Sequence, residues 1–124
     1  MKAKLRHMLS YAVDGRLEDY LPENPYSFLL YLRLDIGPDD SLDTESFELT
    51  ICTPDMIEAT CNDRFSIWGL HMLIVKEYDF PKIWQEIERQ LEKLDAPSWD
   101  LLALQLGRIA SWEFADYVPA VPNL

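Results

Sequence analysis

Few residues of this chain could carry chemistry: two cysteines, two histidines and one group of acids. Cys52 is a candidate nucleophile if a base lies beside it, and His71 could occupy a neighbouring strand. A packed thiol is the simpler interpretation, because cysteine is commonly buried and Cys52 ends a strand-like segment. Cys52 and Cys61 lie nine positions apart with no histidine close in sequence, which does not match zinc-binding spacing. We therefore expect no catalytic residue and no metal ligand among these side chains, His7 included.

The acids form a group between two segments that alternate like strands. Its members are Asp35, Asp39, Asp40, Asp43, Glu45 and Glu48. Hard cations prefer carboxylate ligands, but the group lacks the Asp-x-Asp-x-Asp-Gly pattern of a calcium loop. None of the four glycines is spaced for a phosphate-binding loop, so we expect no cofactor. The simplest interpretation is that these acids lie on a solvated loop without a binding role. The alternative that we favour is a surface that faces a protein partner.

The overall charge supports that alternative. The chain has twenty-two acids and eleven Lys and Arg, which gives a formal net charge of -11. A net charge of roughly 2–8 in magnitude is enough to keep a small domain soluble. Residues 1–63 hold thirteen acids and five bases, a net of -8; residues 64–124 hold nine and six, a net of -3. Excess negative charge attracts basic partners and speeds their capture. A merely soluble acidic protein remains the other interpretation.

Length and composition are those of one folded domain, residues 1–124. The chain is 48% hydrophobic and 12% aromatic, which excludes a disordered acidic tail. No apolar run approaches the roughly 18–20 residues of a membrane span. The basic start, residues 1–7, is not followed by the apolar core of a signal peptide. We therefore expect a cytoplasmic protein with reduced thiols and no membrane contact.

Alternation predicts about four strands. From Ser27 to Gly37 the even positions are apolar and the odd positions mixed, and Phe47 to Cys52 alternates in the same way. A loop of about ten residues joins these two strands, so they should form an antiparallel hairpin. His71–Lys76 and Lys4–Val13 predict two more strands, while residues 17–26 contain two prolines and predict an irregular connection.

Helical spacing dominates the C-terminal third. Thr53-Pro54-Asp55 predicts the start of a short helix that ends near Cys61. Asp79 to Leu94 has apolar residues along one helical face, and Ser98 should cap a further helix that continues toward Trp112. Strands first and helices last predict an α+β fold: an antiparallel sheet of about four strands with the C-terminal helices packed on one face.

A segment rich in aromatic and acidic residues, which we call the aromatic and acidic string, follows this predicted helix. Six residues belong to it or approach it: Arg108, Trp112, Glu113, Phe114, Asp116 and Tyr117. We expect a structural role, because large aromatic side chains at the end of a helix usually pack. Arg108 precedes Trp112 by four positions and is a candidate for stacking or pairing. A binding surface is the alternative.

Several short motifs, taken in order, resemble the immunity protein 8 family of bacterial polymorphic toxin systems. They are Ile36-Gly37-Pro38-Asp39-Asp40, Glu45-Ser46-Phe47, Cys52-Thr53-Pro54, Leu73-Ile74-Val75 with Tyr78-Asp79, Ser98-Trp99, and Leu106 to Tyr117. The resemblance covers residues 17–117. Two places depart from the family pattern: Asp55-Met56-Ile57 stands where Trp-Leu often follows Cys-Thr-Pro, and Asp43-Thr44 where a glycine is common.

The resemblance implies a non-enzymatic antitoxin, of the kind found in contact-dependent inhibition, that binds and blocks a cognate toxin domain. Many such toxins are nucleases with basic grooves, so the expected partner is a basic protein, and neither nucleic acid nor membrane. The six grouped acids would steer it. Tyr31 and Trp68 are candidate anchors of the interface, with Tyr20 and Tyr26 as further candidates.

Three other functions stay open at this point. An acidic mimic of nucleic acid would inhibit several unrelated DNA-binding proteins, whereas an antitoxin serves one toxin. A general interaction module is a second alternative. An enzyme that uses Asp35, Asp39 and Asp40 with a divalent metal is the third. The sequence does not decide between a monomer and a homodimer.

Overall fold

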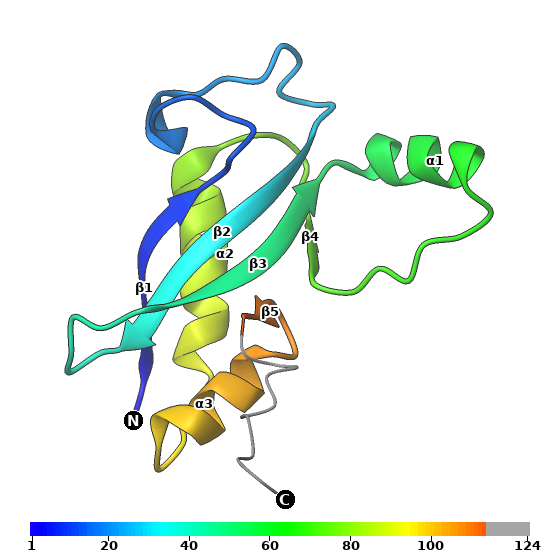
Figure 1. Cartoon of the computed structure of the whole chain (residues 1–124). Coiled ribbons are helices and arrows are strands. Elements are labelled where there is room, and N and C mark those ends of the chain that lie inside the picture. The colour runs from blue at the N-terminus through cyan, green and yellow to red at the C-terminus, as the bar shows by residue number, and fades with distance from the viewer. Residues whose placement is uncertain (114–124) are drawn as a thin grey trace, which may run out of the picture.

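The computed structural model describes residues 1–113, which form one twisted sheet with a long helix against one of its faces (Figure 1). The strands are β1 (Ala3–Leu9), β2 (Leu29–Pro38), β3 (Glu45–Cys52), β4 (Met72–Ile74) and β5 (Ser111–Trp112). The helices are α1 (Pro54–Asp63), α2 (Phe80–Glu92), α3 (Trp99–Leu106) and a single 3-10 turn, η1 (Leu17–Asp19). The predicted α+β class is confirmed. No helix in this described part of the chain is long and apolar enough to cross a membrane.

The sheet has the order β1-β2-β3-β4, and β5 also pairs with β3. β1, β2 and β3 are antiparallel, and the predicted hairpin places Arg33 opposite Glu48. β4 departs from the expected pattern because it pairs parallel to β3, with Thr50 opposite Met72. A parallel pair needs a crossover connection, and α1 supplies it. One side of β3 is thus shared by β4 near its end and by β5 near its start.

The core lies between the sheet and α2. The alternating residues of β2 and β3 that were expected on one face are buried there: Leu30, Leu32, Leu34, Ile36, Phe47, Leu49 and Ile51. α2 adds the buried stripe Ile83, Ile87 and Leu91, a spacing of four residues that keeps them on one helical face. Each buried side chain of this size stabilises the fold by roughly 1.5–3 kcal/mol relative to exposure. Asp79 caps α2 as predicted, since its Oδ1 accepts the Lys82 N–H at 3.1 Å.

The predicted second C-terminal helix is wrong in its length. Ser98 does cap α3, its Oγ accepting the Leu101 N–H at 3.3 Å, but the helix ends at Leu106. Ser111–Trp112 instead pairs with β3, and the Trp112 ring stacks on Phe47 with centroids 6.5 Å apart. Gly107 weakens the helix at this point. Pairing with the open edge of β3 and the contact with Phe47 therefore favour a strand over a longer helix. Phe114, Asp116 and Tyr117 lie outside the described residues.

Two predicted strands are shorter than expected. β1 ends at Leu9 rather than Val13, and its register shifts between Leu5 and His7. β4 begins only at Met72, because His71 has a φ of 52°, a left-handed conformation that does not continue a strand. The irregular connection over residues 17–26 is confirmed, with η1 as its only regular turn among the described residues.

Candidate interaction surface

The tip of the β2–β3 hairpin holds three of the predicted acids on a braced loop. Arg6 Nη2 donates hydrogen bonds to the Ser41 carbonyl at 2.8 Å and the Pro38 carbonyl at 3.3 Å. The Asp39 N–H donates to the Lys2 carbonyl at 3.0 Å. These contacts use backbone groups of the loop, so they shape it without neutralising its carboxylates.

Asp39, Asp40 and Asp43 are exposed, and no ion pair of theirs is found within residues 1–113. Gly37 explains how the loop closes: a Cβ at this position would lie 1.7 Å from the Asp43 carbonyl oxygen. Only glycine permits this approach. The result is an acid loop, residues 39–43, whose three exposed carboxylates lie on a fixed backbone.

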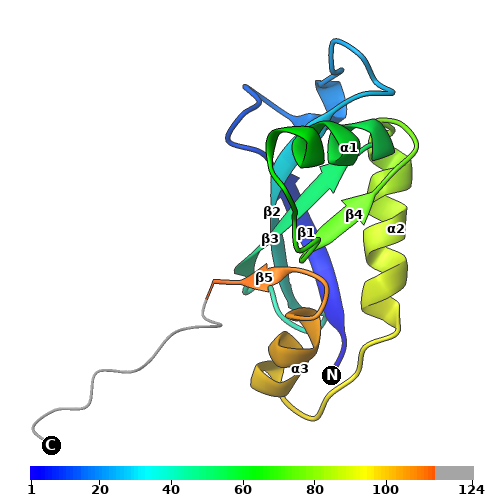
Figure 2. The same cartoon turned by 90° about the vertical axis from the view of Figure 1, so that its right-hand side faces the viewer.

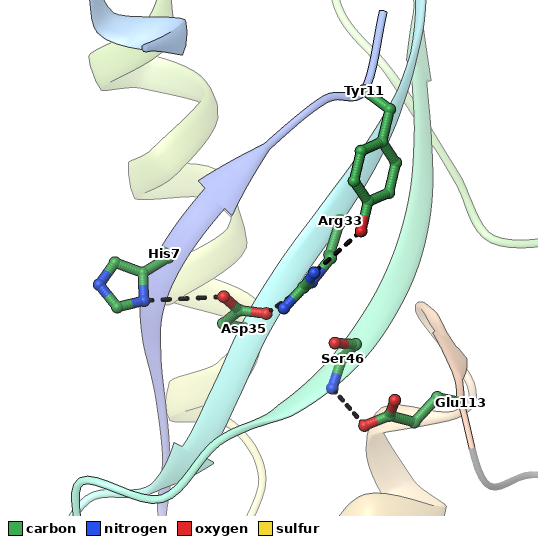
Figure 3. A network of polar contacts seen from close by, with 6 residues as sticks. All are labelled: His7, Tyr11, Arg33, Asp35, Ser46 and Glu113. Atoms are coloured by element: carbon green, nitrogen blue, oxygen red, sulfur yellow. Dashed lines mark hydrogen bonds and ion pairs between the residues drawn. The ribbon is translucent and has the colours of Figure 1, made fainter. Parts of the chain in front are cut away.

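Asp35 differs from the other predicted acids because it is only 8% exposed. Its Oδ1 accepts a hydrogen bond from Arg33 Nε at 3.0 Å, and its Oδ2 lies 3.7 Å from His7 Nδ1 (Figure 3). Arg33 also donates to the Tyr11 hydroxyl at 2.9 Å. The Tyr11 hydrogen bond and the Asp35 charge together raise the pKa of the Arg33 guanidinium. Asp35 thus belongs to a polar network on the open sheet face, with its charge balanced by Arg33.

The start of β3 is tied to the aromatic and acidic string. Glu45 accepts a hydrogen bond from the Trp112 indole N–H. The Glu113 carboxylate accepts the Ser46 N–H at 2.8 Å (Figure 3). The Glu113 N–H in turn donates to the Ser46 carbonyl at 3.1 Å. These bonds give Glu45 and Glu113 local structural partners. Arg108 is exposed just after α3.

A shallow hollow of about 350 Å³ lies on the open face of the sheet, opposite the core. Tyr31 is 70% exposed there, and the side chain of Glu48 is exposed on the same face. Tyr11 and Ser111 line the hollow, and Leu70 reaches it from the segment that precedes β4. Two predicted interface residues, Tyr31 and Glu48, therefore share one surface. The acid loop occupies the end of the same hairpin.

Trp68 lies apart from the hairpin, in the loop between α1 and β4, and is 91% exposed. Sequence reasoning missed its neighbour Phe65, which is fully exposed in the same loop. It also missed that α1 has no buried residue. The available signal was the helix sequence itself, in which Met56 and Ile57 are the only large apolar residues and form no repeating stripe.

The candidate catalytic pair is not assembled. Cys52 is fully buried, and burial, with a smaller effect of the Asp55 charge, raises the pKa of its thiol. An activated cysteine needs the opposite shift. His71 is engaged elsewhere, its Nε2 lying 2.8 Å from the Gly107 carbonyl. Within residues 1–113 no three His, Cys, Asp or Glu side chains are grouped to hold a metal.

The fold and these surfaces belong to a small acidic α+β protein. Its exposed groups are carboxylates and aromatic side chains suited to protein contact. A family model described as Immunity protein 8 matches residues 3–117, and the chain therefore belongs to the immunity protein 8 family. This membership confirms the resemblance seen in the sequence motifs. It supports an immunity protein that binds a cognate toxin. Searches of curated proteins and of solved structures found no match.

Proposed function

We propose that the protein neutralises a basic, nuclease-type toxin domain in the cytoplasm by direct contact, without catalysis. The observation that carries this proposal is the acid loop, whose three carboxylates are exposed while Arg6 and Gly37 fix the backbone beneath them. A nuclease presents positive charge to bind phosphate, and the loop offers negative charge to the same groups. The net charge of -11 adds a long-range attraction.

Different residues of such an interface control the association rate and the lifetime of the complex. Complementary charge raises association rates by roughly 10- to 1,000-fold at low salt, and it contributes less to the lifetime of the complex. Lifetime depends on a desolvated centre, in which aromatic side chains dominate. In this proposal the acid loop and Glu48 capture the toxin, and exposed aromatic residues hold it.

The proposal expects the neighbouring gene to encode the cognate toxin, and it is tested by co-expressing that toxin domain with this protein. Cells that produce the toxin domain should survive only when the immunity protein is present, and the two chains should co-purify as a stoichiometric complex. Purified complex should show no cleavage of RNA or DNA. Survival without any complex would contradict the proposal. Equal inhibition of unrelated DNA-binding proteins would instead identify a nucleic-acid mimic.

A further inference from the structure

The crossover helix α1 buries no side chain fully within residues 1–113, and only Met56, Ile57 and Thr60 are partly covered. Crossover helices between parallel strands ordinarily pack on a face of their sheet. Here α2 occupies the inner face, and α1 stands away from the sheet edge (Figures 1 and 2). None of its ten residues is buried. Because a helix of this length is marginal alone in water, a partner that covered α1 would stabilise it.

The loop that returns from α1 to β4 is exposed and aromatic. Phe65 is fully exposed, Trp68 is 91% exposed and Leu70 is 70% exposed. We call residues 54–71, which comprise α1 and this loop, the arm. Aromatic side chains each bury about 150–250 Å² at an interface, and tryptophan is enriched among the residues that dominate binding. An exposed group of this kind marks a docking surface.

Both ends of the arm are attached firmly to the sheet. At its start, Thr53 Oγ1 accepts the Phe28 N–H at 3.1 Å, and Asp55 accepts a hydrogen bond from Ser27. At its end, the His71 carbonyl accepts the Thr50 N–H at 2.9 Å. Firm attachment limits the entropy lost when the arm binds a partner.

The charge of the arm indicates its partner. Asp55, Glu58 and Asp63 oppose a single base, Arg64, so the arm is acidic like the rest of the chain. A second copy would bring its own net charge of -11 against this surface, which disfavours self-association. A basic partner meets no such repulsion.

We propose that the arm is the anchor of the toxin complex: Phe65 and Trp68 insert into an apolar recess bordered by basic residues on the toxin domain. This inference rests on the proposed function and adds the surface that holds the toxin. Leu70 makes the arm continuous with the hollow on the open sheet face, so Tyr31 and Glu48 extend the same interface. The arm sets the lifetime of the complex, and the acid loop sets its rate of formation.

The test replaces Phe65 and Trp68 together by serine and measures toxin binding by surface plasmon resonance. Dissociation should accelerate at least tenfold, while the association rate stays within about twofold, since the charge is unchanged. Leu104→Ser is the matched control, because Leu104 is an exposed apolar residue of α3. Both variants should keep the thermal stability of the wild type, since the replaced side chains are exposed.

Two outcomes would overturn the inference while leaving the proposed function intact. One is a doubly substituted arm that binds the toxin with the wild-type dissociation rate. The other is a wild-type homodimer in analytical ultracentrifugation that the arm substitutions convert to monomer with toxin binding unchanged, which would make a second copy the occupant. Failure of the wild-type protein to bind the toxin would reject the proposed function itself, and the inference with it.

Discussion

The guanidinium of Arg6 donates a hydrogen bond of 2.8 Å to the Ser41 carbonyl, and so joins the first strand to the acid loop. The two residues are 35 positions apart in the sequence. The contact places a positive charge beneath a loop that carries three exposed carboxylates. Because its acceptors are backbone carbonyls, it orders the loop and leaves those carboxylates available to a partner.

Replacing Arg6 by methionine should destabilise the fold, because the carbonyls at the hairpin tip lose their donor while the apolar stem is kept. Hydrogen bonds that involve a charged group contribute about 1.5–3 kcal/mol, and a loss in this range is expected in urea unfolding. Lys4→Met is the matched control: it removes one positive charge from an exposed position of the same strand. Equal stability of the two variants would show that Arg6 does not brace the loop.

Gly37→Ala should be destabilising by at least about 2 kcal/mol, because its Cβ would overlap the Asp43 carbonyl oxygen at 1.7 Å. Both groups belong to the backbone of the hairpin, so relief requires the loop to move. Gly107→Ala is the control: its Cβ would lie 3.3 Å from the nearest atom in a helical conformation. Chemical denaturation of both variants measures the difference. A tolerated Gly37→Ala would mean that the acid loop is not fixed as described.

Tyr78 couples the irregular connection to the core. Its hydroxyl donates a 2.8 Å hydrogen bond to the Leu17 carbonyl, and burial, followed by the nearby Tyr20 and Glu18, raises its pKa from 10 to about 12. A raised pKa means that the folded state favours the neutral phenol. Its contribution to stability is therefore complete below pH 10 and is lost as the pH rises through about 12.

Tyr78→Phe should consequently cost about 1 kcal/mol at pH 8, the usual worth of a buried hydrogen bond. The difference from the wild type should shrink between pH 10 and pH 12, because only the wild type loses stability there through this group. Urea unfolding of both proteins at pH 8, 10 and 11.5 measures it. A difference that stays constant over this range would exclude the assigned coupling.

Much of the fold follows from local pattern. β2 and β3 could be predicted because alternate side chains face a core, and α2 because Ile83, Ile87 and Leu91 recur at helical spacing. β5 could not be predicted, because a strand of two residues forms only through its pairing with β3 and has no pattern of its own. The parallel pairing of β4 likewise depends on tertiary structure, because it is set by the path of the chain through α1.

The candidate surface was predicted in part for the same reason. Asp35 and Arg33 lie two positions apart on one strand, so their shared face could be inferred from the sequence. The approach of His7 and Tyr11 could not, because it depends on the register between β1 and β2. The exposure of Phe65 depends on the path of the loop between α1 and β4, which no local pattern specifies.

The last prediction tests the proposed steering role of the acid loop. Changing Asp39, Asp40 and Asp43 to asparagine should slow association with the toxin domain roughly 3- to 10-fold at low salt, because the charges that attract a basic groove are lost. Dissociation should change little, since the loop lies apart from Phe65 and Trp68, the proposed anchor. Stopped-flow association measured from 20 mM to 1 M salt tests both statements.

A matched variant distinguishes the effect of the position of the three acids from the effect of the net charge. Asp14→Asn, Glu23→Gln and Glu92→Gln remove the same three charges from exposed positions outside the loop, and none of these acids has an ion pair among the described residues. Both triple variants have a formal net charge of -8, three less negative than the wild type at -11. The loop variant should associate more slowly than this control at low salt. The two should converge near 1 M salt, where the screening length falls to about 3 Å. Identical rates at every salt concentration would mean that total charge, and not the acid loop, steers the toxin.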